Sequence, residues 1–140
     1  TKQRSQGSKT MGNTEVKTVL IIEDNPMNME LAGDLLEMAG FRVLSSDTAT
    51  AGMRLAMEKM PDVILMDIAL PDMDGLTATR RLKEDPELRH IPVVALTAHA
   101  MSGDEAKALE AGCDGYITKP IDTRSFAKSV EEVLARNSIR

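Results

Sequence analysis

The stretch DVILMDIALPDMDG, residues 62–75, decides how this chain folds. It begins with a short apolar run of the kind that forms a buried strand, and it then passes through Asp67 into a loop marked by Pro71 and Gly75. A carboxylate is costly in an apolar interior unless it has partners. The stretch therefore predicts a strand whose last residue lies at a polar site.

Four other runs resemble the first, and longer segments with helical spacing of apolar residues separate them. Five strands that alternate with five helices predict an α/β fold, in which helices flank a five-stranded parallel sheet and the crossovers are right-handed. The runs around Ile21, Ile64 and Val94 are apolar almost throughout, so we expect them at the centre of the sheet. The other four runs are TVLIIED (18–24), FRVLSS (41–46), IPVVALT (91–97) and DGYITKP (114–120).

The composition indicates one globular domain. With 140 residues, 42% of them hydrophobic, the chain is large enough for one core. A formal net charge of -5 disfavours direct DNA binding, because binding to phosphates needs basic residues in excess. The single cysteine, Cys113, cannot form an intrachain disulfide, and no apolar run is long enough to span a membrane. We expect a cytoplasmic protein.

The chain divides into two parts. Residues 1–16 are polar and lack apolar periodicity, so we expect a disordered N-terminal tail. A basic targeting arm and a natural start at Met11 both stay open for this segment. Residues 17–138 are expected to form the folded domain.

Polar residues follow four of the predicted strands. Ligands of open parallel sheets bind beyond the carboxyl ends of the strands, so these side chains are expected to converge on one pocket. Carboxylates held close together repel one another, and Mg²⁺ with oxygen ligands is the ordinary remedy. A carboxylate beside a metal, a hydroxyl and an ammonium can take up a phosphoryl group. The residues concerned are Glu23, Asp24, Asp67, Thr97 and Lys119.

Taken singly, each of these residues has an ordinary structural explanation. Asp67 or Asp24 could cap a helix, Thr97 could bond to its own backbone, and Lys119 could be a solvated surface charge. These separate explanations do not account for the position of all five residues at one edge of the sheet. Two other residues are interpreted as structural: Cys113 as a small core residue and His90 as part of a surface loop.

Four strings in this order resemble the receiver domain of two-component response regulators, over residues 18–136. Any one of these strings alone would be a weak signal. Four of them in the order and at the strand ends of the family make the resemblance specific. Two longer stretches, residues 22–40 and 112–122, resemble a type of regulator that consists of a receiver domain alone. The four strings are IIEDN (21–25), LMDIALPDMDG (65–75), VVALTA (93–98) and YITKP (116–120).

The resemblance implies a doubly wound sheet of the flavodoxin-like (βα)5 type, and it implies a role for each site residue. Asp67 would be the phosphoacceptor. Glu23 and Asp24 would position Mg²⁺ with it, and the backbone carbonyl of Ala69 would complete the metal ligands of the protein. Thr97 would bind a phosphoryl oxygen.

Further roles follow from the same resemblance. Lys119 would pair with the phosphoryl group, and the Lys119-Pro120 bond would be cis. Tyr116 would be the switch residue that moves inward with Thr97. Ala69 and His99 occupy positions that influence hydrolysis of the aspartyl phosphate in the family, so the lifetime of the phosphorylated state stays open.

The resemblance also implies partners and a function. A histidine kinase or histidine phosphotransfer protein would donate the phosphoryl group. The helix expected over residues 102–111, the strand with Tyr116 and the last helix would then contact a downstream protein. Because the sequence ends at Arg140, after the fifth predicted helix, a single-domain regulator is expected, not an enzyme acting on external substrates.

Other classes of protein stay open to different degrees. A receiver domain cut from a hybrid histidine kinase would look the same. A pseudo-receiver adaptor, indifferent to phosphorylation, would be expected to lack part of the pocket. A phosphatase of the haloacid dehalogenase type would need a second Asp where this chain has Ala69, and EDNPMN (23–28) offers no glycine-rich turn for a dinucleotide.

Overall fold

The computed structural model describes residues 16–98 and 104–138. The expected tail over residues 1–16 therefore lies almost wholly outside the described residues, as do His99 and Ser102. Strands and helices alternate along the chain, as the sequence predicts. The elements are β1 (Thr18–Ile22), α1 (Pro26–Met38), β2 (Arg42–Ser46), α2 (Ala49–Lys59), β3 (Val63–Asp67), α3 (Gly75–Glu84), β4 (Val93–Thr97), α4 (Asp104–Ala111), β5 (Gly115–Thr118) and α5 (Phe126–Ser138).

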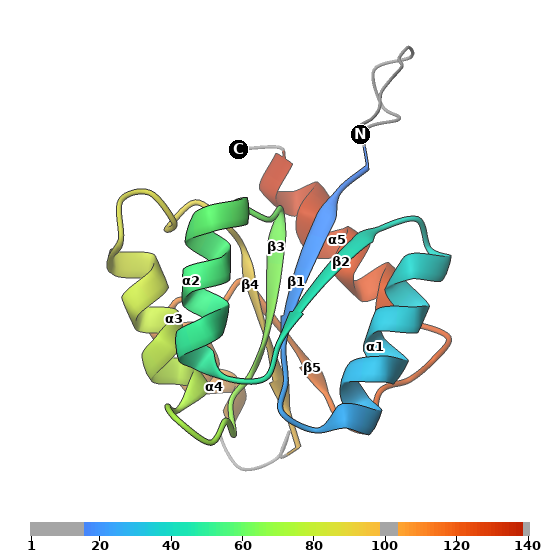
Figure 1. Ribbon diagram of the computed structural model, residues 1–140, viewed down its shortest axis with the longest axis horizontal. Helices are drawn as coiled ribbons and strands as arrows, with labels where there is room; N and C mark the ends of the chain where they lie inside the picture. The colour runs from blue at the N-terminus through green and yellow to red at the C-terminus, as the bar shows by residue number, and fades with distance from the viewer. Residues whose placement is uncertain (1–15, 99–103, 139–140) are drawn as a thin grey trace.

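The five strands form one parallel sheet in the order β2-β1-β3-β4-β5. Helices α1 and α5 cover one face, and α2, α3 and α4 cover the other (Figure 1). All residues of β3 and β4 are buried, whereas β2 and β5 at the edges are mixed. The predicted fold class is confirmed, and so is the assignment of central and edge strands.

Local signals in the sequence explain where the helices begin and end. The side chain of Asn25 caps α1 by accepting hydrogen bonds from the N–H groups of Met27 and Asn28, with Pro26 in the first turn. Gly40 and Gly112 follow helices with φ angles of 98° and 105°, which favour glycine. An asparagine cap, a proline in the first turn and a glycine after the last turn are typical of helix ends.

A short turn leads into the last helix, and α5 begins at Phe126, four residues after Asp122. The side chain of Asp122 accepts a hydrogen bond from the N–H of Arg124, and its carbonyl accepts one from Phe126. Asp122 thus closes a turn that leads into the helix.

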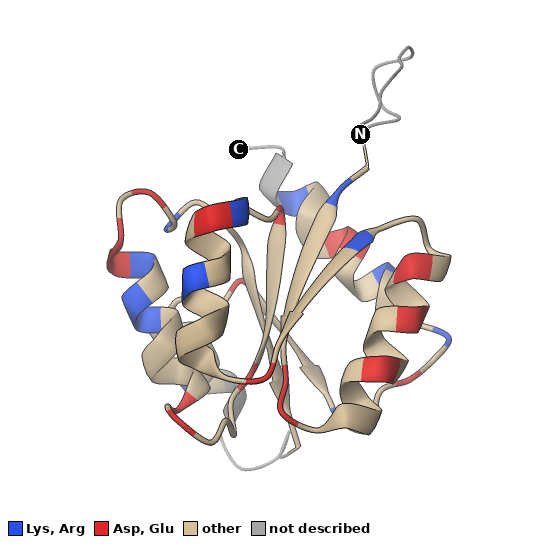
Figure 2. Ribbon diagram, viewed as in Figure 1, with Lys and Arg blue, Asp and Glu red and all other residues tan. Residues whose placement is uncertain are grey.

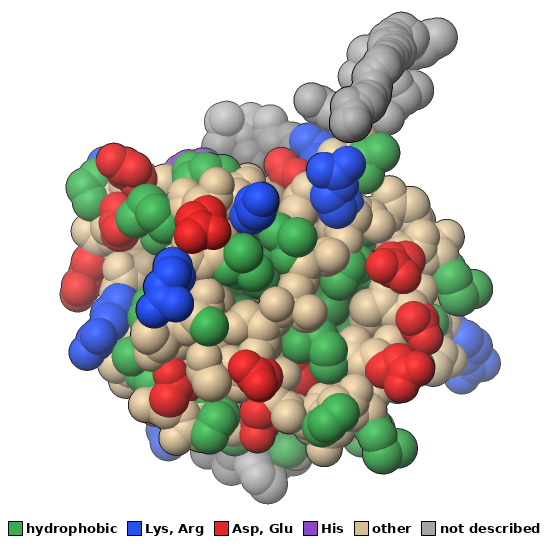
Figure 3. All heavy atoms as spheres, viewed as in Figure 1, with side chains coloured by type: hydrophobic (Ala, Val, Ile, Leu, Met, Phe, Trp, Pro, Cys, Tyr) green, Lys and Arg blue, Asp and Glu red, His purple; other side chains and the backbone are tan. Residues whose placement is uncertain are grey.

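Charge is distributed unevenly over the elements. Figure 2 shows acidic residues along α1 and at the carboxyl ends of the central strands, and basic residues along α3. In the space-filling view, acidic side chains gather over α1 and near the lower edge, where the strands end (Figure 3). None of the helices in the described part of the chain has the length and apolar character that a membrane span requires.

Two glycines within helices differ in the space around them, and this difference gives a test of the packing. A Cβ atom at Gly52 would overlap with the side chain of Ile22, which is fully buried, whereas one at Gly33 would lie 3.8 Å from Val43. We expect Gly52→Ala to lower the free energy of unfolding by about 1–3 kcal/mol. Gly33→Ala should raise it by up to about 1 kcal/mol, because alanine favours a helix.

Urea unfolding followed by circular dichroism measures both changes. An equal effect of the two substitutions would contradict the close packing of α2 on β1.

Candidate functional site

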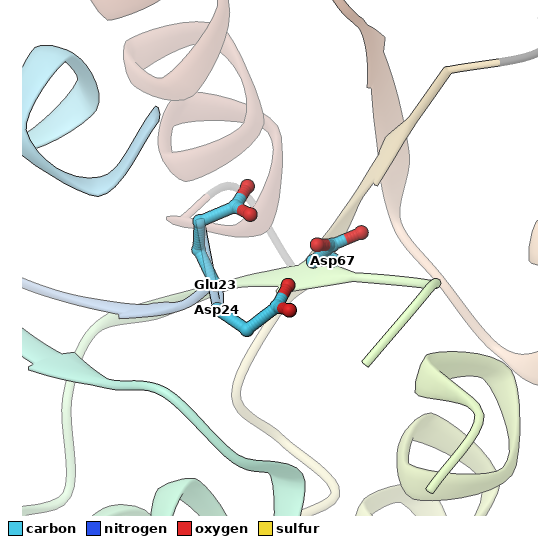
Figure 4. Close-up of side chains that lie close together, drawn as sticks. All are labelled: Glu23, Asp24 and Asp67. Carbon is cyan, nitrogen blue, oxygen red and sulfur yellow. The ribbon is translucent and has the colours of Figure 1, made fainter. Parts of the chain in front are cut away.

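Three carboxylates meet at the carboxyl ends of two neighbouring strands. Glu23 and Asp24 directly follow β1, and Asp67 is the last residue of β3 (Figure 4). Because Ile22 pairs with Met66 in the parallel register, Glu23 and Asp67 occupy adjacent places on the sheet. One carboxylate oxygen from each of the three residues lies within 4.8 Å of the others. Glu23 and Asp67 are only 2% and 3% exposed, whereas Asp24 is exposed.

Lys119 brings a positive charge to this cluster from beyond β5. Its Nζ lies 2.9 Å from Oε1 of Glu23 and 3.3 Å from Oδ2 of Asp67. The side chain of Lys119 is only 17% exposed, so water screens these ion pairs weakly. One ammonium therefore serves two buried carboxylates.

The pKa values of Glu23 and Lys119 reflect the burial of both side chains and the charges next to them. Burial raises the pKa of Glu23, and Asp67 adds to this effect, against Lys119 and the N–H of Asn25, which lower it. Burial by itself would lower the pKa of Lys119, but the carboxylates of Glu23 and Asp67 outweigh it and raise the pKa. Lys119 therefore stays charged, and the cluster is short of positive charge.

These residues fit a divalent cation. Oxygen atoms from carboxylates are the ligands that Mg²⁺ prefers, usually one or two carboxylates together with water. Glu23 Oε1 is buried and receives no hydrogen bond of good geometry among the described residues, although the Lys119 ammonium lies close to it. A buried carboxylate oxygen whose nearby ammonium is shared with a second carboxylate, inside a cluster of negative charge, is what a cation would satisfy.

Thr97 reaches the same edge of the sheet. It ends β4, it is only 2% exposed, and its carbonyl accepts a hydrogen bond of 2.7 Å from the N–H of Lys119. The Lys119-Pro120 bond that follows is cis, as the resemblance implies. The structure thus brings Glu23, Asp24, Asp67, Thr97 and Lys119 to one end of the sheet.

The remaining residues singled out in the sequence lie at various distances from this cluster. The N–H of Ala69 donates a hydrogen bond to Oδ1 of Asp67, so the loop folds back on the carboxylate. Tyr116 lies on β5 and is 36% exposed. His90 is exposed and Cys113 is buried, as expected for a surface loop and a core residue.

The loop after Asp67 makes a long-range contact that the sequence did not indicate. Asp72 accepts hydrogen bonds from the start of α2, which lies 22 and 23 residues earlier in the chain. Local patterns cannot reveal such a pair, because they carry no information on which helix end faces which loop. The signal present in the sequence was a second acidic residue, Asp72, beside the Asp74 that caps α3.

The fold and this acidic end of the sheet define a class of protein. The chain belongs to the response regulator receiver domain family, whose model matches residues 19–131. It is 47% identical over 118 residues to the polar-differentiation response regulator DivK of Brucella ovis, an alignment that covers 84% of this chain and 96% of the relative. DivK of Brucella abortus matches to the same extent. The resemblance to single-domain regulators is confirmed at this level.

Solved structures agree with the fold. A putative response regulator from Chloroflexus aurantiacus has a TM-score of 0.84 at 27% identity, covering 87% of this chain and all of that one. The receiver domain of a sensor histidine kinase from Pseudomonas aeruginosa has a TM-score of 0.79 at 32% identity, covering 86% and 99%. That structure has a magnesium ion coordinated in its active site cleft.

The shared ammonium allows a direct test of the electrostatics. Lys119→Met keeps the length of the side chain but leaves two buried carboxylates without a counter-charge. In the absence of divalent cations, we expect the free energy of unfolding to fall by on the order of 2 kcal/mol, less than for a fully buried pair because the ammonium is partly hydrated. Added Mg²⁺ should restore part of the loss.

Urea unfolding in a chelator, repeated with Mg²⁺, measures both effects. Lys128→Met at an exposed position of α5 is the control and should change neither value. A loss of the same size in the control would contradict the role of Lys119.

Proposed function

We propose that the chain is a phosphorylation-controlled switch of a two-component phosphorelay, in which Asp67 accepts the phosphoryl group. A phosphohistidine of a histidine kinase or a histidine phosphotransfer protein is the donor. The observation that carries this proposal is the position of the Asp67 carboxylate, which is nearly buried, next to two further carboxylates and 3.3 Å from the Lys119 ammonium. The family and the similarity to DivK support it.

The residues of the site have separate tasks in the transfer. An oxygen of Asp67 attacks the phosphorus atom, a P–O bond forms, the P–N bond to the histidine breaks, and the imidazole leaves with its electron pair. Glu23, Asp24 and Asp67, with the carbonyl of Ala69, would hold Mg²⁺. This ion would neutralise charge on the phosphoryl oxygens.

Two more side chains would hold the phosphoryl group once it is transferred. Lys119, now shared between Glu23 and Asp67, would pair with a phosphoryl oxygen, and the hydroxyl of Thr97 would donate to another. The reaction is directed at the chain itself: phosphotransfer to Asp67, followed by autodephosphorylation. No external substrate is turned over.

The signal would leave the site through the elements next to it. When Thr97 and Lys119 move toward the phosphoryl group, they bias the segment after β4, the strand β5 with Tyr116, and the helices α4 and α5. The hydrogen bond from Lys119 to the carbonyl of Thr97 already joins these segments. This face would contact the downstream protein, and no direct DNA binding is involved.

The wider assignments belong to the same proposal. Residues 17–138 would form one receiver domain that works in the cytoplasm. A receiver domain of a hybrid histidine kinase is a second candidate, because the Pseudomonas aeruginosa domain is 32% identical to this chain. A pseudo-receiver adaptor is less well supported, because all the polar positions of the pocket are present.

Incubation with Mg²⁺ and acetyl phosphate tests the chemistry. We expect intact-mass measurement to show an adduct of one phosphoryl group that requires Mg²⁺, because the cluster needs a divalent cation to take on more negative charge. Asp67→Asn is the matched control, since it removes the attacking oxygen while keeping the size of the side chain.

An adduct in the Asp67→Asn variant would place the modification elsewhere. Absence of any adduct, with a competent histidine kinase also supplied, would favour the adaptor.

The switch is tested separately from the chemistry. We expect Thr97→Ala still to accept the phosphoryl group, because the attacking oxygen and the carboxylates are unchanged. Its backbone amides in β5 and α5 should lose most of the chemical-shift changes that phosphorylation causes in the native chain. Heteronuclear NMR before and after acetyl phosphate measures this, and full changes in the variant would argue against Thr97 as the switch residue.

A further inference from the structure

Asp72 connects the loop after Asp67 to the start of helix α2. Its Oδ1 accepts a hydrogen bond of 2.9 Å from the N–H of Ala49. Its Oδ2 accepts two more, of 3.0 Å from the N–H of Thr50 and 2.7 Å from the Thr50 hydroxyl. Both oxygens of one exposed carboxylate are therefore used by a helix that lies 22 and 23 residues away in sequence.

The first turn of helix α2 has N–H groups that these bonds satisfy. The first N–H groups of a helix have no acceptor within the helix, and an anionic group near them is stabilised by the helix dipole. Thr48 caps Ala51 through its hydroxyl, with a distance of 3.2 Å, and Asp72 takes the N–H groups of Ala49 and Thr50. The cap of α2 is thus shared between a residue of its own segment and a residue of another loop.

The same carboxylate fixes the middle of the loop between β3 and α3. At the start of this loop, the N–H of Ala69 bonds to Asp67. At its end, the N–H of Gly75 bonds to the carbonyl of Ile68, with a distance of 3.1 Å. A Cβ at Gly75 would overlap with the carbonyl oxygen of Asp67, so the two ends of the loop are closed tightly against each other.

Between these ends, the side chains of Leu70 and Met73 pack on the core that α2 helps to form. Asp72 adds a directed polar anchor to that packing. Asp72 lies only three residues after Ala69, so a shift of Asp72 away from α2 would affect the position of Ala69.

We propose that Asp72 is a positioning residue for the metal site: by binding the start of α2, it holds the loop that contains Ala69 in place beside Asp67. The inference rests on the proposed function, in which the carbonyl of Ala69 is a metal ligand. Asp72 itself touches neither the cation nor the phosphoryl group. It acts on them through the position of the loop, as residues around a metal site act through its ligands.

The charge of Asp72 supports this role. The Thr50 hydroxyl and the N–H groups of Ala49 and Thr50 lower the pKa of Asp72 to about 2. The carboxylate is therefore ionised throughout the neutral range, and the anchor does not depend on a proton.

Two caps of the same helix give a matched experiment. Asp72→Ala removes the bonds from the loop to α2, whereas Thr48→Ala removes a bond within the cap and leaves the loop attached. Both should lower the melting temperature. Only Asp72→Ala should weaken Mg²⁺ binding, by roughly tenfold, as measured by calorimetric titration with MgCl₂.

Equal Mg²⁺ affinity of the two variants would overturn the inference, because Asp72 would then be a helix cap and nothing more. Asp72→Asn keeps one acceptor oxygen and is expected to lie between Asp72→Ala and the native chain. If Asp72→Asn binds Mg²⁺ less well than Asp72→Ala, the hydrogen bonds are not the cause and the inference also fails.

Amide hydrogen exchange without Mg²⁺ separates this inference from the proposed function. Asp72→Ala should speed exchange at Ala69 and Gly75, and Thr48→Ala should not. If the native chain binds no Mg²⁺, the proposed metal chemistry fails, and the exchange result alone decides whether Asp72 positions the loop. Unchanged exchange in Asp72→Ala would overturn it.

Discussion

Three negatively charged side chains are held close together at the carboxyl end of the sheet, and the repulsion between them governs the rest of the site. One oxygen from each of three carboxylates lies within 4.8 Å of the others, because the residues end or directly follow the neighbouring strands β1 and β3. Two of the three side chains are buried, where repulsion between them is strong. The fold offsets part of this cost with the ammonium of Lys119, which lies between Glu23 and Asp67. The remaining negative charge would favour the binding of a cation.

This arrangement also explains how a change at Asp67 would spread. Lys119 contacts Asp67 through its side chain and Thr97 through its backbone N–H, so it belongs to the charged cluster and to the junction of β4 and β5. A new negative charge on Asp67 would alter the balance between the two partners of Lys119. Phosphorylation can shift the population of the two conformations only as far as their contacts with the phosphoryl group differ. Lys119 and Thr97 would make the contacts that differ.

The sequence predicts the strands and the convergence of the site residues, but it does not predict the tertiary contacts around the site. Apolar runs identify the central strands, because those strands are covered on both faces, and the carboxyl ends of parallel strands must meet at one edge. Convergence of Glu23, Asp67, Thr97 and Lys119 follows from this geometry. The order of the strands and the cap by Asp72 do not, since each depends on tertiary contacts that local patterns do not encode.

The contact between Asp72 and α2 shows why such contacts matter for a site made of strand ends. The sheet fixes Glu23 and Asp67, which belong to its strands or directly follow them, whereas Ala69 lies on the loop after β3 and is joined to the sheet by its N–H bond to Asp67. A helix that supplies no proposed ligand holds that loop through the free N–H groups of its first turn. The geometry of the metal site would therefore depend on α2 as well as on the strands. Substitutions at the start of α2 would alter this geometry without contacting the metal ligands.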